Sequence, residues 1–173
     1  MHHGKAAVYE EKREGQIVQI GMLLAMALVF QVFFARFMQP VVGPLVNMTL
    51  ILSVLLVGKR AGVLVGSMTP ILAYTLGIMP LFPLLPLVVS GNITYVVLFD
   101  RWKGHNPYLA VMVSALGKFL VLALGVRWGI PLFIGRVPPM VTTTFGLPQL
   151  YTALIGGGFA LFLYEKLRKK KVR

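Results

Sequence analysis

One lysine inside a long apolar run is the side chain of this sequence best suited to chemistry. Lys118 stands ten residues after Tyr108, within the apolar stretch 108–127. If that stretch is a helix that crosses a membrane, a rise of about 1.5 Å per residue places Lys118 near the middle of the bilayer. A lysine at that depth costs about 2.5–3.5 kcal/mol on insertion scales, and it usually faces a bundle interior or a wet cavity. Lys118 therefore predicts a buried site whose charge needs a partner.

The acidic residues do not supply that partner. All five lie outside the apolar runs, at Glu10, Glu11, Glu14, Asp100 and Glu165. Three explanations of the lysine stay open: its amine is neutral, its side chain reaches up to the membrane surface, or a ligand brings the negative charge. We favour the ligand, which would then carry a carboxylate or a phosphate.

Further polar side chains are expected at membrane depth around Lys118. Asn92 should lie at a similar depth, and Asn47, Tyr74 and Gln149 towards the outer side. Such residues often only join helices, through hydrogen bonds worth about 0.6 kcal/mol on average. Taken together, they are also what a small-solute cavity needs, namely a few placed polar groups in an apolar wall.

The composition shows which elements must position these residues. Of the 173 residues, 57% are hydrophobic and 13% are charged, and the mean hydropathy is +0.81. Soluble domains average about 45–50% apolar and about 25% charged residues. Because one bilayer crossing takes about 20 residues, most of the chain must be spent on crossings. The sequence predicts an all-α integral membrane bundle.

Six apolar stretches divide the chain into a head (1–15), a transmembrane substrate-binding domain (16–164) and a basic tail (165–173). The second stretch is shorter than the usual 17–25 or so residues of a spanning helix, so a re-entrant segment is the competing interpretation. The six predicted helices are 16–35, 44–57, 62–76, 84–99, 108–127 and 140–164.

The basic residues predict the orientation. Thirteen of the 17 lysines and arginines fall in the head, the loops after the second and fourth helices, and the tail. The opposite loops hold only Arg36, Arg127 and Arg136. Positive charge collects on the cytoplasmic side of membrane proteins, so both termini are expected in the cytoplasm. The net charge of +12 thus reflects topology, and we expect no nucleic-acid partner.

The sequence lacks the common patterns of catalysis. It has no cysteine, its three histidines are His2, His3 and His105, and no phosphate-binding loop, zinc-protease motif or nucleophile elbow occurs. We therefore predict no enzyme, no catalytic residue, no metal and no cofactor. Proton- or sodium-coupled transport usually needs carboxylates within the membrane, so energy for any uphill transport would come from a partner.

Three stretches carry a resemblance to a known family. They are 43–47 (Gly-Pro-Leu-Val-Asn), 76–80 (Leu-Gly-Ile-Met-Pro) and 83–99, which contains Gly91-Asn92. With them the chain resembles the substrate-binding S components of energy-coupling factor (ECF) vitamin transporters. The resemblance implies a multi-pass protein of a prokaryotic plasma membrane that binds a vitamin-like solute. It also implies a transmembrane T component and two cytoplasmic ATPase subunits as partners.

The resemblance also implies two sites. Family ligands bind near the outer side, in a region that here holds Asn92, Lys118, Arg127, Gln149 and Tyr151. A pair of small residues on the first helix contacts the T component in that family. The matching positions here are Gly21 and Ala25, with glycine in place of the first alanine. From the residues alone, this pair could equally pack inside the bundle.

The sequence leaves three functional hypotheses. The leading hypothesis is capture of a small anionic vitamin or precursor; pantothenate, nicotinate, lipoate or a folate would fit the charge. A ligand-free membrane scaffold is the second, and it predicts that Lys118 tolerates Leu or Met. An integral membrane enzyme that modifies lipids is the third, and it would ordinarily need a metal or an acid cluster.

Overall fold

The computed structural model describes residues 2–34, 39–79 and 81–171, and these residues form helices without any strand. Most of the helices are long and run along the bundle, whereas the segments around 125–144 are short. In chain order they are α1 (His2–Phe33), α2 (Gln39–Leu56), α3 (Lys59–Thr75), α4 (Leu84–Trp102), α5 (Pro107–Leu124), the π-helical η2 (Gly125–Gly129), α6 (Pro131–Ile134), α7 (Pro139–Thr144) and α8 (Leu147–Lys171).

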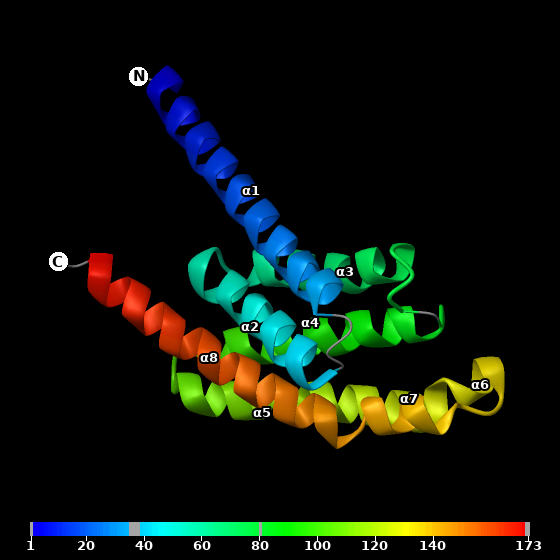
Figure 1. Cartoon of the computed structure of the whole chain (residues 1–173). Helices are drawn as coiled ribbons and strands as arrows, with labels where there is room; N and C mark the ends of the chain where they lie inside the picture. The colour runs from blue at the N-terminus through cyan, green and yellow to red at the C-terminus, as the bar shows by residue number, and fades with distance from the viewer. Residues whose placement is uncertain (1, 35–38, 80, 172–173) are drawn as a thin grey trace.

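Five helices form a closed ring. Each packs against the next in the order α2, α3, α4, α5 and α8, and α8 returns to pack along α2. Helix α1 lies outside the ring against α2 and α3, and its N-terminal part projects beyond the bundle (Figure 1). The predicted all-α bundle is confirmed, and its centre is the space that the five ring helices enclose.

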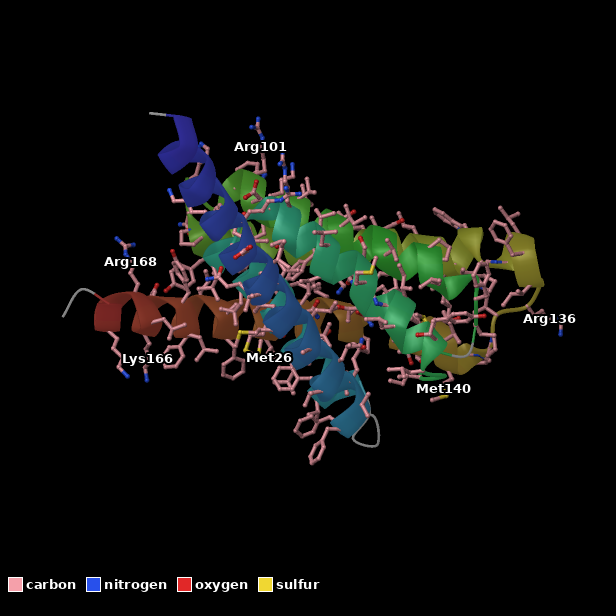
Figure 2. All side chains as sticks on the ribbon, turned by 90° about the horizontal axis from the view of Figure 1, so that it is seen from above. Met26, Arg101, Arg136, Met140, Lys166 and Arg168 are labelled. Atoms are coloured by element: carbon pink, nitrogen blue, oxygen red, sulfur yellow. The ribbon has the colours of Figure 1, made fainter. Side chains whose placement is uncertain are left out.

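The two ends of the bundle differ in charge. Both termini and the α2–α3 and α4–α5 connections lie at one end, whereas α6 and α7 lie at the other (Figure 1). Figure 2 shows Arg101, Lys166 and Arg168 at the first end and Arg136 at the second. This is the separation that the predicted orientation requires, and we call the end with α6 and α7 the outer end.

The surface of the bundle is apolar along its length. Four described segments are long and apolar enough to cross a membrane: Lys12–Phe33, Leu84–Trp102, Pro107–Ile134 and Pro139–Lys170, beside the shorter apolar helix Val41–Leu56. Large apolar side chains such as Met22, Val29 and Phe33 on α1 are exposed. Helices satisfy their own backbone hydrogen bonds, which is why they can present such a surface to lipid.

Several predicted boundaries change in the structure. The head is helical and continuous with α1. Helix α2 begins at Gln39, before the predicted start at residue 44, and runs for 18 residues. The predicted helix 140–164 is interrupted by Phe145 and Gly146, which separate α7 from α8. The predicted outer-loop residue Arg36 lies outside the described residues.

Two glycines allow α2 and α8 to approach closely. A Cβ atom on Gly156 of α8 would lie against the carbonyl oxygen of Pro44 and 2.7 Å from Cβ of Asn47, both on α2. One on Gly43 of α2 would lie 2.7 Å from Cβ of Thr152 on α8. Small residues at helix interfaces in membranes let backbones pack against one another. This contact brings Asn47 of α2 beside Thr152 of α8.

Substituting Gly156 should therefore destabilise the bundle. Gly156→Ala places a Cβ against backbone atoms of α2, and overpacking of this kind typically costs about 1–3 kcal/mol. The matched control is Gly158→Ala on the same helix, where no atom lies within 4 Å of the new Cβ. Thermal unfolding of the purified protein in detergent should show a lower midpoint for Gly156→Ala alone. Equal midpoints for the two variants would contradict the close α2–α8 contact.

Candidate functional site

Lys118 ends inside the ring of helices. Its side chain is buried, with 4% exposed, and its ammonium donates hydrogen bonds to Oδ1 of Asn47 at 2.6 Å and to Oδ1 of Asn92 at 2.8 Å. One acceptor comes from α4, which packs against α5, and the other from α2, which is not a neighbour of α5 in the ring. The lysine therefore does not reach up to the membrane surface, and that explanation of its position is wrong.

The two asparagines are held by contacts of their own. Asn92 donates from Nδ2 to the carbonyl oxygen of Gly66 on α3 at 2.9 Å. Asn47 donates from Nδ2 to Oγ1 of Thr152 on α8 at 3.5 Å, and Thr152 in turn donates to the carbonyl oxygen of Gln149. Because each amide nitrogen is used in this way, each amide oxygen is turned towards Lys118.

An aromatic ring completes the surroundings of the ammonium. Nζ of Lys118 lies 5.5 Å from the ring centroid of Tyr95 on α4, within the range of a cation–π interaction. The Tyr95 hydroxyl donates to the carbonyl oxygen of Ala153 on α8 at 2.7 Å, which fixes the ring. We call the set Asn47, Asn92, Tyr95, Lys118 and Thr152 the lysine cluster.

The cluster offers no counter-charge to a protonated Lys118. Lys118 is the only charged side chain among the buried residues that the structure describes, and its hydrogen-bond partners are neutral amides. Burial of a charge is costly unless it is paired as well as hydrogen-bonded. The two amide oxygens supply hydrogen bonds but no counter-charge.

The structure brings together only part of the predicted site. Gln149 is buried, and its backbone carbonyl oxygen accepts the hydrogen bond from Thr152 of the cluster. Tyr74 is half-buried, with its ring centroid 5.6 Å from that of Phe82. Arg127 is exposed on η2, and Tyr151 is 58% exposed on α8. Lys118, Asn47 and Asn92 thus meet directly, whereas Tyr74, Arg127 and Tyr151 make no described contact with them.

Two members of the cluster were missed as site residues. Tyr95 follows Asn92 by three residues on α4, and Thr152 follows Gln149 by three on α8. Residues three apart lie on one helix face, so helical spacing would have found both.

A small apolar cluster lies between Lys118 and the outer end. Leu84, Val126 and Ile130 are buried there, and Val141 and Phe145 pack against them. Val126 follows Lys118 by eight residues along the α5–η2 run, a distance of about 12 Å. We call these five residues the outer cluster; it separates the lysine cluster from the outer end.

The described residues contain no group of three or more metal-ligating side chains of the His, Cys, Asp or Glu type. A surface hollow lined by Lys59, Arg60, Val63 and Leu64 lies at the start of α3, at the end of the bundle opposite the outer end. None of the predicted site residues lines it.

The predicted docking pair lies on the free side of α1. Gly21 and Ala25 are exposed, whereas Leu23 and Ala27 are buried against the bundle. A Cβ on Gly21 would have no atom within 4 Å, so this face is open to another helix.

The family model described as "ECF transporter, substrate-specific component" matches residues 15–167. The match covers α2 to α7 completely and ends four residues before the end of α8. No curated protein and no solved structure matches the chain.

The hydrogen bonds of Lys118 can be tested by a double-mutant cycle. Asn92→Leu removes an acceptor from a buried ammonium, and loss of one partner of a buried polar pair costs about 1–3 kcal/mol. In a Lys118→Met background, Asn92→Leu should lower the free energy of unfolding clearly less, because no ammonium is then left without its acceptor. Thermal or chemical unfolding of the four proteins measures the difference. Equal costs in both backgrounds would show that Asn92 and Lys118 are not coupled.

Proposed function

The chain belongs to the substrate-specific components of ECF transporters, and we propose that it captures a small anionic vitamin or vitamin precursor from outside the cell. Components of this family are parts of transporters, so the chain is a membrane protein and not an enzyme. In this proposal Lys118 supplies the charge that meets the anion, and Asn47 and Asn92 hold its ammonium in place.

The observation that carries the proposal is a buried ammonium at mid-membrane depth whose partners are neutral. Lys118 lies near the middle of the candidate span Pro107–Ile134, where an unpaired charge is most costly. Ionisable residues within a membrane usually mark the path of a solute or an ion. A solute carboxylate or phosphate would give Lys118 the counter-charge that no described buried residue provides.

The outer end is the side from which the solute would arrive. The outer cluster is built partly from η2 and α7, which are short segments beside the long ring helices. Displacing these short segments disturbs less packing than separating two ring helices. We therefore propose that the solute approaches between α7 and the start of α4.

The proposed setting is a prokaryotic plasma membrane, with six crossings and both termini in the cytoplasm. The basic residues at the end that carries both termini support this orientation. Energy would come from a transmembrane T component and two ATPase subunits, because the chain itself carries no nucleotide-binding motif. The exposed pair Gly21 and Ala25 on α1 is the proposed contact with the T component.

A ligand-free scaffold is the second candidate, and one observation favours it. The hydrogen bonds of Lys118 already join α2, α4 and α5, which a purely structural lysine would also do. The two functions differ in one respect. A scaffold should retain no solute and should lose no binding when Lys118 is replaced.

Replacing the lysine tests the charge directly. Lys118→Met should weaken solute binding at least about tenfold, since a charge-assisted hydrogen bond is worth about 1.5–3 kcal/mol. The matched control is Lys59→Met, at the first turn of α3 and outside the lysine cluster. Native mass spectrometry of the purified proteins gives the mass of the retained solute and its occupancy. Equal occupancy in the wild type and in Lys118→Met would remove Lys118 from the site.

The α1 face is tested with a bulky residue. Gly21→Leu should abolish co-purification with the T component, because the added side chain keeps the two helices apart. Gly15→Leu is the control: a Cβ there also has open space, but the position lies outside the small-residue pair. An affinity pull-down of the co-expressed transporter compares the two variants. Full recovery of the complex with Gly21→Leu would place the contact elsewhere.

A further inference from the structure

The number of buried charges limits the kind of anion that the bundle can accept. Lys118 is the only buried cation among the side chains that the structure describes. The next basic residue along the same run is Arg127, which is exposed and lies nine residues further on, a distance of about 13 Å along the helix. Among the described side chains, a small solute whose acid group reaches Lys118 would therefore meet no second buried cation.

A second negative charge on the solute would therefore stay unpaired in the bundle. A buried charge without a partner is strongly disfavoured. A phosphate monoester is largely a dianion at neutral pH, since its second pKa lies near 6, and it meets the same difficulty as a dicarboxylate.

A positive group on the solute would also lack a partner. Asp100 pairs with Lys103 at 2.8 Å, Glu165 accepts a hydrogen bond from Tyr108 at 3.2 Å, and both lie at the end of the bundle that carries the termini. The remaining described acidic side chain, Glu14, is exposed on the projecting part of α1. No described carboxylate reaches the lysine cluster to meet an amino group.

The hydrogen-bond donors of Lys118 agree with a single acid group. An ammonium has three N–H donors, and hydrogen bonds to Asn47 and Asn92 use two of them among the described residues. One donor is left for one oxygen of the solute. A carboxylate needs no more than this to be fixed at one end while its remainder packs against apolar side chains.

We infer that the solute bound at Lys118 carries one negative charge and no positive charge, and that it is a monocarboxylate. This inference rests on the proposed function, and it narrows the anion to one class. A monocarboxylate pairs its only charge with Lys118. Dicarboxylates, phosphate monoesters and amino acids are excluded because each would bring a further charge that stays unpaired.

Four probes with one six-carbon skeleton test the inference: hexanoate, adipate, 6-aminohexanoate and hexyl phosphate. Each is titrated into the full-length protein in lipid nanodiscs, and the shift of the thermal unfolding midpoint gives its apparent affinity. Hexanoate should bind at least about tenfold more tightly than the other three. The preference should disappear in Lys118→Met, which controls for partition of the probes into lipid.

The outcomes separate the inference from the proposed function. A Lys118-dependent shift by adipate or hexyl phosphate as large as that by hexanoate overturns the single-charge inference and leaves anion capture standing. No Lys118-dependent shift by any anion overturns both. A second measurement uses the co-purified solute in place of the probes. After methyl esterification, its mass should show one added methyl group, as for a single carboxylate. Two added methyl groups, or a phosphate group in the solute, would overturn the inference.

Discussion

The hydrogen bonds from one ammonium to two amide oxygens are the interaction on which this bundle depends most. Lys118 on α5 binds Asn47 on α2 and Asn92 on α4. Through Gly66 the connection extends to α3, and through Thr152 to α8, so it touches every helix of the ring. In a membrane the hydrophobic effect does not drive helices together, and close packing and interhelical hydrogen bonds must do so. The cluster is therefore placed where a few polar contacts can fix the positions of five helices.

The glycines set the geometry that these hydrogen bonds require. Gly156 lets α8 lie against the backbone of α2 near Asn47, and a Cβ added to Gly66 of α3 would lie 3.3 Å from Cβ of Asn92. A larger residue at either position would move an asparagine away from Lys118. Buried polar networks are strong when all their members are satisfied and costly when one is not. The glycines thus allow the close helix packing that the hydrogen bonds of Lys118 need.

The sequence predicts the depth of each residue better than the helix face on which it lies. Lys118 and Asn92 meet as expected because both stand in the middle of long apolar runs. Arg127 follows Lys118 by nine residues, or two and a half turns of about 3.6 residues, which turns it to the opposite face. Tyr151 follows Gln149 by two residues, and residues two apart do not share a face. The break at Phe145 and Gly146 did have a sequence signal: Gly146 stands just past the end of α7 and Pro148 lies in the first turn of α8, the usual order of these residues between two helices.

The hydrogen bonds of Lys118 can be explained by the fold alone, but its charge cannot. A neutral side chain such as glutamine could donate hydrogen bonds to both asparagines without burying a charge, and replacing buried charges by neutral groups is often harmless or stabilising. A lysine in this position gives up stability that the ring could otherwise keep. In the proposed function that loss is recovered when a negative group of the solute reaches the ammonium, because no described carboxylate of the chain does so. In that proposal, the unpaired charge of Lys118 makes the empty protein less stable. The same charge makes binding of an oppositely charged solute more favourable than binding of a neutral one.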